Sequence, residues 1–261
     1  MRGKLKQLSL GIATLLMCHS AFAADAAAIP RMASGVPDFT GMWAGPGFQH
    51  TGTEVDNPTA ALYDDKRMSP FKSGADKTFI RTTGDVRIDD PTAVCLPNGL
   101  TRQIASPYPQ QWVQTDSELI ILYEYMHFFR HIPLGEPNRA HAPVFENTYM
   151  GDSIAWFDGD SLVIDTVGLR EWLLDAFHPE AGGSRWHSAN THVVERLTYT
   201  DGSNVNYEVT IDDPSTFTTP WTQPWAMQRK QTWKLFEFIC EDNNRCEAGV
   251  CQAADVQLDD Q

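Results

Sequence analysis

The chain has 261 residues, with 34 acidic against 20 basic side chains and a net charge of −14 at pH 7 when its histidines are neutral. A surface with such an excess of carboxylates repels nucleic acids and anionic lipids, so we expect neither as a partner. The length suits one large all-β domain or two small ones. Because no linker-like stretch divides the chain, we predict a single domain.

Residues 1–23 have the pattern of a secretory signal peptide. Basic side chains come first, an apolar run follows over residues 8–17, and Ala21-Phe22-Ala23 supplies the small residues that signal peptidase requires. We therefore expect a periplasmic or secreted protein. Removal of this segment takes away three basic residues and no acidic one, which moves the net charge to −17.

Cys18 allows a second interpretation, a lipid anchor, although Met17 is a poor residue before a lipidated cysteine. No later run approaches the roughly 18 apolar residues of a membrane helix, so we expect no membrane insertion. The sequence gives no indication of the oligomeric state.

Four cysteines remain after cleavage, and an even number in an oxidising compartment favours disulfides over metal or thiol chemistry. Four cysteines allow three pairings. We expect a long-range bridge between Cys95 and Cys240 and a local one between Cys246 and Cys251. The first would tie the front of the domain to its last strand.

After the signal peptide, residues 24–37 are rich in Ala and Pro and are interpreted as a flexible arm. Gly41-x-Trp43 then opens the first expected strand, as Gly-x-Trp commonly does in lipocalin-like barrels, where the Trp fills the closed end of the barrel. Residues 46–110 contain many Pro, Gly, Asp and Thr residues, which predicts long loops with one short helix near Thr59–Lys66.

From Gln111 onwards the pattern is that of strands joined by tight turns. Asp158-Gly159 and Asp201-Gly202 are typical of hairpin turns. The expected strands cover residues 112–115, 118–132, 149–157, 161–167, 191–200, 204–211 and 228–239. Roughly eight to ten strands with little helix predict an all-β antiparallel meander that closes into a lipocalin/calycin-like barrel over residues 38–244, followed by a tail over 245–261.

The stretch Glu118–Ile132 is dense in aromatic and β-branched residues, which favours one long strand or two with a bend. Side chains alternate across a strand. One face would carry Leu119, Ile121, Tyr123, Tyr125, His127, Phe129 and His131. The other would carry Glu124, Met126, Phe128 and Arg130. We therefore expect two imidazoles on an aromatic wall beside a cavity.

Several motifs along the chain resemble those of a large family of exported, β-rich proteins of environmental bacteria. They include Asp90-Pro-Thr-Ala-Val-Cys-Leu-Pro97, Leu122-Tyr-Glu-Tyr-Met-His127, Trp156-Phe-Asp-Gly-Asp-Ser-Leu-Val-Ile-Asp-Thr166, Val194-Glu-Arg196 and Phe236-Glu-Phe-Ile-Cys240. The resemblance spans about residues 38–244. It implies export and a β-rich domain, associates Cys95 with Cys240, and supplies no reaction. The loop Leu134-Gly-Glu-Pro-Asn138 departs from the family pattern.

Imidazole is the usual proton carrier near neutral pH. We therefore predict catalysis by His127 as general acid or base, with Tyr125 or His187 as its partner. The expected substrate-binding side chains are Tyr123, Phe129, Arg130, His141, Trp186 and Arg196. The predicted function is a cofactor-free lyase, isomerase or cyclase that acts on a small apolar or aromatic metabolite.

Three other interpretations stay open. The same pocket would serve a carrier without turnover. A metal-assisted hydrolase would use His141, His187 and His192, although no tight metal-ligand spacing supports it. Each histidine could also be a hydrogen-bonded filler of a barrel wall. Arg130 and Arg196 are expected to pair with a buried carboxylate, Glu124 or Glu208, because an unpaired buried guanidinium is very costly.

Overall fold

The computed structural model describes residues 28–46, 72–75, 80–81, 83, 85–137, 139–143, 146–174, 184–247 and 250–253. The signal peptide expected over residues 1–23 and the helix expected near residues 59–66 lie outside these ranges. In the arm expected over 24–37, Arg31 forms an exposed ion pair with Asp160 at 2.8 Å. None of the described helices is long and apolar enough to span a membrane.

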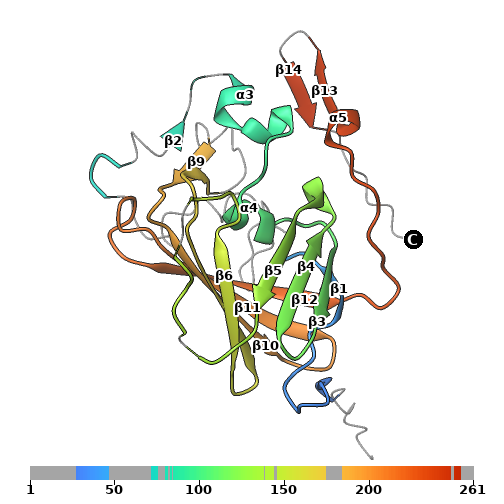
Figure 1. The fold of residues 1–261 in the computed structure, drawn as a ribbon. Helices are drawn as coiled ribbons and strands as arrows, with labels where there is room; N and C mark the ends of the chain where they lie inside the picture. Colours follow the sequence, from blue (N-terminus) through green and yellow to red (C-terminus); the bar gives the residue numbers. More distant parts are fainter. Residues whose placement is uncertain are drawn as a thin grey trace, which may run out of the picture.

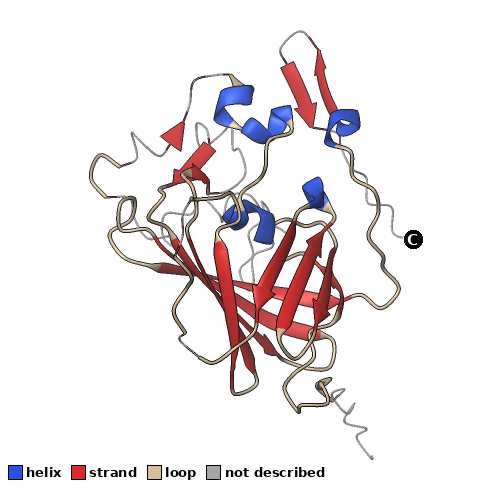
Figure 2. Ribbon diagram, viewed as in Figure 1, coloured by secondary structure: helices blue, strands red, loops and turns tan. Residues whose placement is uncertain are grey.

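The dominant element is one antiparallel sheet of nine strands that curls into a nearly closed barrel (Figures 1 and 2). Its strands are β1 (Gly41–Ala44), β3 (Gln110–Gln114), β4 (Glu118–Tyr123), β5 (Phe129–Pro133), β6 (Asp152–Asp158), β7 (Ser161–Val167), β10 (His192–Tyr199), β11 (Asn204–Asp212) and β12 (Trp221–Arg229). Their order in the sheet is β5-β4-β3-β1-β12-β11-β10-β7-β6. The expected all-β antiparallel barrel is confirmed.

The strand order determines where the barrel closes. Each strand is antiparallel to its neighbour, and with nine strands the two outer ones, β5 and β6, must run in the same direction. The seam between them carries a single parallel bridge, Leu134 with Ala155, and a hydrogen bond of 3.0 Å from the Gly135 amide to the Ala155 carbonyl. Backbone pairing is therefore sparse at this seam.

Alternation of side chains builds the core. In β10, the side chains of Val193, Glu195, Leu197 and Tyr199 are buried, and those between them are half-buried. Trp43 of the Gly-x-Trp motif is 1% exposed and lies among Phe39, Trp112 and Tyr199, with the Arg229 guanidinium 5.4 Å from its ring. The Trp of this motif thus fills the barrel as expected.

Short elements cover the other end of the barrel (Figure 2). They are α3 (Val86–Asp89), the 3₁₀ turn η1 (Pro91–Val94) and α4 (Leu100–Ile104). Leu100 and Ile104 of α4 are buried in the core. A small sheet of β2 (Ile80–Arg81), β9 (Ser184–His187) and β8 (Trp172–Leu173) lies near them.

The stretch Glu118–Ile132 contains two strands rather than one: β4 and β5 form a hairpin around the 3₁₀ turn η2 (Tyr125–His127), so the alternative of one long strand was wrong. A second expectation was also wrong. The last barrel strand is β12, which ends at Arg229 rather than at Ile239.

After β12, residues 230–239 form no strand and run along the outside of the barrel to α5 (Cys240–Asn243), as Figure 1 shows. We call residues 230–239 the strap. Beyond α5, β13 (Asn244–Glu247) and β14 (Val250–Ala253) form a hairpin in which Cys246 is directly opposite Cys251. The side chains of these two cysteines lie outside the described part of the structure.

Candidate functional site

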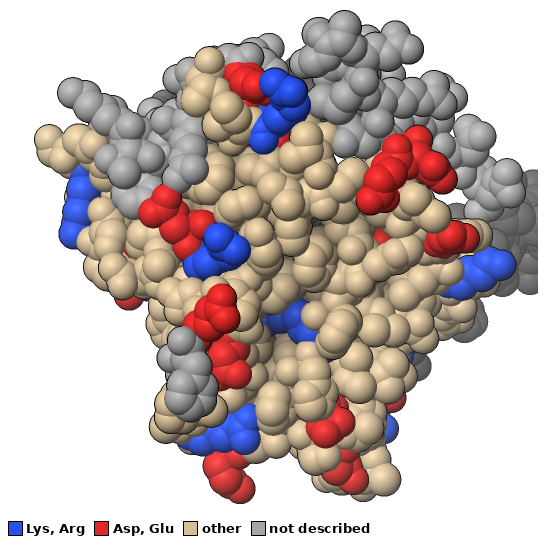
Figure 3. All heavy atoms as spheres, turned by 45° about the horizontal axis from the view of Figure 1, so that its top comes forward, with Lys and Arg blue, Asp and Glu red and all other residues tan. Residues whose placement is uncertain are grey.

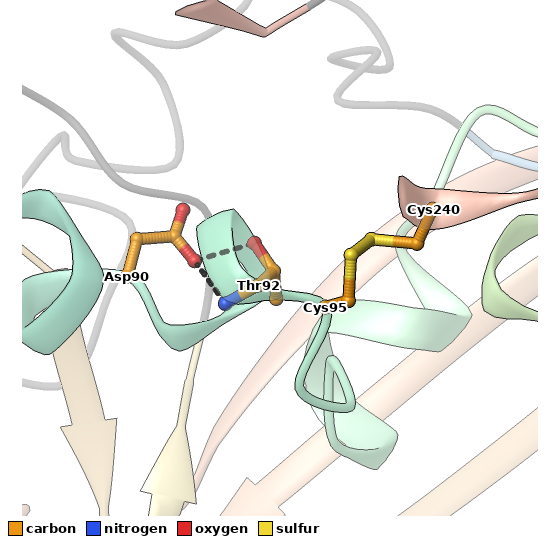
Figure 4. The surroundings of a disulfide bond; sticks show 4 residues. All are labelled: Asp90, Thr92, Cys95 and Cys240. Carbon is orange, nitrogen blue, oxygen red and sulfur yellow. Dashed lines mark hydrogen bonds between the residues drawn. A yellow bond between two sulfur atoms is a disulfide. The ribbon is translucent and has the colours of Figure 1, made fainter. Parts of the chain in front are cut away.

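The strap is fastened to the barrel by a disulfide between Cys95 and Cys240, with Cα atoms 5.7 Å apart. This confirms the long-range pairing. Cys95 ends the turn η1, whose start is capped by Asp90: its carboxylate accepts hydrogen bonds from the Thr92 amide at 3.2 Å and from the Thr92 hydroxyl at 2.6 Å (Figure 4). Arg102 pairs with the same carboxylate at 2.6 Å. The anchor point of the strap is therefore held by a partly buried charge network.

Two side chains at the turn η2 hold the strap through its backbone. The Phe236 amide donates to Oε2 of Glu124 at 2.8 Å, and the Phe238 amide donates to Nε2 of His127, also at 2.8 Å. Because Nε2 accepts this bond, it carries no proton, and the neutral ring holds its proton on Nδ1. With the strap in place, His127 has a hydrogen to donate and no free nitrogen to act as a base.

Tyr125 lies beneath the strap. Its ring stacks on Tyr108 at 4.6 Å between centroids and meets the edge of Phe238 at 4.8 Å. Burial raises the pKa of the Tyr125 phenol above its ordinary value of 10.0. The ring therefore serves as an aromatic floor that orients Phe238.

A pocket of about 460 Å³ lies between η2, the disulfide and the strap. Its apolar lining consists of Pro97, Met126, Phe128, Phe238 and Ile239. The disulfide pair Cys95–Cys240, His127 and two carboxylates, Glu237 and Glu241, complete it. Sequence reasoning identified His127 and Tyr125 here but missed the strap, whose aromatic residues resemble a strand.

Backbone strain is concentrated around this pocket. Among the described non-glycine residues, three have a positive φ: Cys95 (61°), Met126 (61°) and His127 (52°), and all three line the pocket. Such conformations cost on the order of 1–3 kcal/mol each and persist where the surrounding structure enforces them. Strain of this kind gathers at ligand sites more than elsewhere.

Tyr123 and Arg130 lie elsewhere, inside the barrel. Nη2 of Arg130 is 2.7 Å from Oε1 of Glu195 and donates to Ser153 at 3.0 Å and Thr166 at 3.1 Å. Arg130 thus pairs with a buried carboxylate as expected, but the partner is Glu195 and neither Glu124 nor Glu208. The alternation of β10, which buries Val193, Leu197 and Tyr199, was the signal that places Glu195 inside.

The phenol of Tyr207 donates to Glu195. Burial raises the pKa of Tyr123 to about 12 and that of Tyr207 well above its ordinary value. Nε and Nη1 of Arg130 make no hydrogen bond within the described residues. This cluster is a polar centre in an otherwise apolar core.

His141 forms part of a cluster on the outer side of the barrel wall. Its Nδ1 lies 2.9 Å from Asp152 and its Nε2 2.8 Å from Oδ1 of Asp165, which is also 2.9 Å from Nε2 of His192. Burial alone would raise the pKa of Asp165, but the hydrogen bonds from His192 and His141 outweigh it and lower that pKa. The hydrogen bond to Asp165 raises the pKa of His192.

His187 and Trp186 are neighbours on β9 and do not line the pocket. His187 is 1% exposed, its Nδ1 donates to the Ser188 carbonyl at 3.0 Å, and burial lowers its pKa. The Ser188 hydroxyl donates to Asp213 at 2.7 Å, so Ser188 and His187 form no nucleophile–base pair. The Trp186 ring meets Trp172 at 5.2 Å.

Phe129 and Arg196 point away from the barrel interior. Phe129 is 63% exposed, and Arg196 forms a surface ion pair with Asp158 at 2.7 Å. The expected single wall of aromatic and imidazole groups is therefore divided. Tyr123 and Arg130 are inside the barrel. His127 lines the pocket, Tyr125 packs against Phe238 beside it, and the other candidates lie elsewhere.

Within the described ranges, no group of three or more His, Cys, Asp or Glu side chains has the arrangement needed to hold a metal ion. Acidic and basic side chains are scattered over the face shown in Figure 3 and form no extended patch of one sign. Comparison of the chain with protein-family models, with characterised proteins and with solved structures finds no match.

Proposed function

We propose that this protein binds a small, largely apolar molecule in the pocket between η2, the disulfide and the strap. The observation that carries the proposal is the coincidence of the pocket with all three strained non-glycine residues described, Cys95, Met126 and His127. A concave, mainly apolar site with a few fixed polar groups is the usual form of a small-molecule site.

The pocket between η2, the disulfide and the strap is a better candidate for the binding site than the barrel interior. Core side chains such as Ile121, Ile132 and Ile164 occupy that interior and are fully buried. The pocket, in contrast, opens to solvent and is walled by a covalently anchored segment. The disulfide also agrees with export to an oxidising compartment, which is part of the proposal.

His127 would act on a bound molecule as a hydrogen-bond donor through Nδ1, since Nε2 is occupied by the Phe238 amide. An enzyme of the lyase, isomerase or cyclase kind would use it here as a neutral hydrogen-bond donor that polarises the substrate, and not as a base. A carrier would use the same bond for orientation only. Any turnover in this pocket should fall roughly 10²–10⁴-fold in His127→Ala, whereas a carrier loses only some affinity.

Binding can be tested with the neutral fluorescent probe N-phenyl-1-naphthylamine. We expect saturable binding that weakens at least about fivefold in Phe238→Ala, since the ring lines the pocket. Phe236→Ala is the matched control, because this ring belongs to the same strap but is 62% exposed and does not line the pocket. Equal affinity of both variants and the wild type, or no binding of the probe, would refute the proposal.

A further inference from the structure

The charge of the pocket indicates what kind of small molecule it takes. Among the described residues that line it, the two formally charged ones are Glu237 and Glu241, and none is a Lys or Arg. His127 is uncharged while it accepts the Phe238 amide. Building on the function proposed above, we infer that the ligand is an organic cation: an amine or quaternary ammonium compound with an apolar body.

The aromatic lining fits the same class. Cations are attracted to the faces of aromatic rings, and a methionine thioether is a soft, adaptable contact for an alkyl or aryl group. Phe128 and Phe238 supply rings at the pocket, and Met126 supplies the thioether. The edge contact with Tyr125 holds the Phe238 ring in place. The ring is therefore ordered before a ligand arrives.

The strap itself already contains cation–ring contacts. Nζ of Lys230 lies 5.2 Å from the centre of the Trp233 ring, and Nζ of Lys234 lies 5.3 Å from that of Phe236. Within the described residues, Phe238 has no such cationic partner and instead lies beside the two carboxylates of the pocket. A cationic ligand would give the Phe238 ring the kind of cation–ring contact that Trp233 and Phe236 already have.

The expected preference is moderate because the pocket is open. An exposed cation–ring contact and two solvent-exposed carboxylates together favour a cation over a neutral molecule of the same size by about tenfold. This preference should shrink as salt is raised from about 10 mM to 500 mM, since exposed charges are screened. Binding of a neutral compound should not depend on salt.

The test is displacement of N-phenyl-1-naphthylamine from the intact protein by benzyltrimethylammonium, benzyl alcohol or phenylacetate. We expect the cation to displace the probe at about one tenth of the concentration needed for the alcohol, and phenylacetate to be the weakest. Glu237→Gln/Glu241→Gln should abolish the preference for the cation. The control Glu136→Gln/Glu146→Gln removes the same amount of charge from exposed positions outside the pocket and should keep the preference for the cation.

Failure of this inference differs from failure of the proposed function. A protein that binds the probe but is displaced equally by the cation and the alcohol has the pocket without the charge preference, which overturns the inference alone. Equal loss of preference in both double variants would also overturn it, since the effect would then be long-range. Absence of probe binding would overturn both proposals.

Discussion

Nη2 of Arg130 lies 2.7 Å from Oε1 of Glu195 inside the barrel, where the two side chains are 2% and 1% exposed. Arg130 comes from β5 and Glu195 from β10, and the same guanidinium donates to Ser153 on β6 and Thr166 on β7. These bonds cross the seam between β5 and β6. The ion pair therefore supplies part of the closure that the backbone does not.

Arg130→Met should lower the free energy of unfolding by about 3–5 kcal/mol, because it leaves the Glu195 carboxylate buried without its partner. Arg196→Met is the matched control: its ion pair with Asp158 is exposed, so the loss should stay below about 1 kcal/mol. Urea unfolding measures both. The double variant Arg130→Met/Glu195→Leu should be more stable than Arg130→Met, and a further loss would contradict this account.

Tyr123 should make the protein sensitive to alkali. Burial raises its pKa from 10.0 to about 12, so the unfolded chain releases this proton more readily than the folded protein. The contribution is complete below pH 10 and is lost as the pH rises towards 12, by up to about 1.4 kcal/mol per pH unit. Denaturant unfolding at pH 9 and pH 11 should show a smaller drop in Tyr123→Phe than in the wild type. An equal drop would mean that the phenol ionises freely.

Asp165 should stabilise the protein most at mildly acidic pH. Its pKa is lowered, so its contribution is present above about 3.8 and is lost as the pH falls through the lower folded value. The pKa of His192 is raised, so its contribution is complete below 6.5 and is lost as the pH rises through the higher folded value. Asp165→Asn should therefore reduce the melting temperature more at pH 5 than at pH 8.

The titration of His192, followed by NMR, provides the direct measurement. In Asp165→Asn its midpoint should fall towards 6.5, because the accepting carboxylate is gone. Glu118→Gln is the control, since its exposed pair with His131, at 3.2 Å, has no part in this cluster. An unchanged His192 midpoint in Asp165→Asn would contradict the assignment.

Loss of the disulfide should release the strap. Cys95 and Cys240 are 145 residues apart, and Cys95→Ser/Cys240→Ser should lower the free energy of unfolding by about 2–5 kcal/mol and expose residues 230–239 to proteases. The predicted Cys246–Cys251 bridge would close only a short hairpin, so Cys246→Ser/Cys251→Ser should lower the free energy of unfolding far less.

Alkylation of the denatured, unreduced protein after signal removal should detect no free thiol. Two reactive thiols would refute the predicted Cys246–Cys251 bridge.

The hairpins were predictable because their turns have specific chemistry. Asp158-Gly159 places a glycine where φ is 60°, and strands β6 and β7 pair around it as expected. The face of the central stretch was not predictable. Met126 and His127 adopt left-handed conformations, so the alternation stops at η2 and the side chains of β5 are reversed. Phe129 consequently points outward, and Arg130 points inward.

The C-terminal part failed for a related reason. No strand was expected over residues 221–227, yet β12 covers them, includes Pro224 and pairs with both β1 and β11. Trp233 and Phe236 suggested a strand, but both rings are exposed, and the strap binds two side chains of η2 rather than another strand. Tertiary contacts decide such segments, and local composition does not encode them.

Because the sheet has an odd number of strands, its two edge strands, β5 and β6, run parallel and leave a weakly paired seam along one side of the barrel. These two strands share a single bridge, whereas every other pair of neighbouring strands shares a ladder of backbone hydrogen bonds. Thermal breathing will open the wall along this line first, with its amides exchanging hydrogen soonest. The buried ion pair between Arg130 and Glu195, which crosses this seam, opposes that opening.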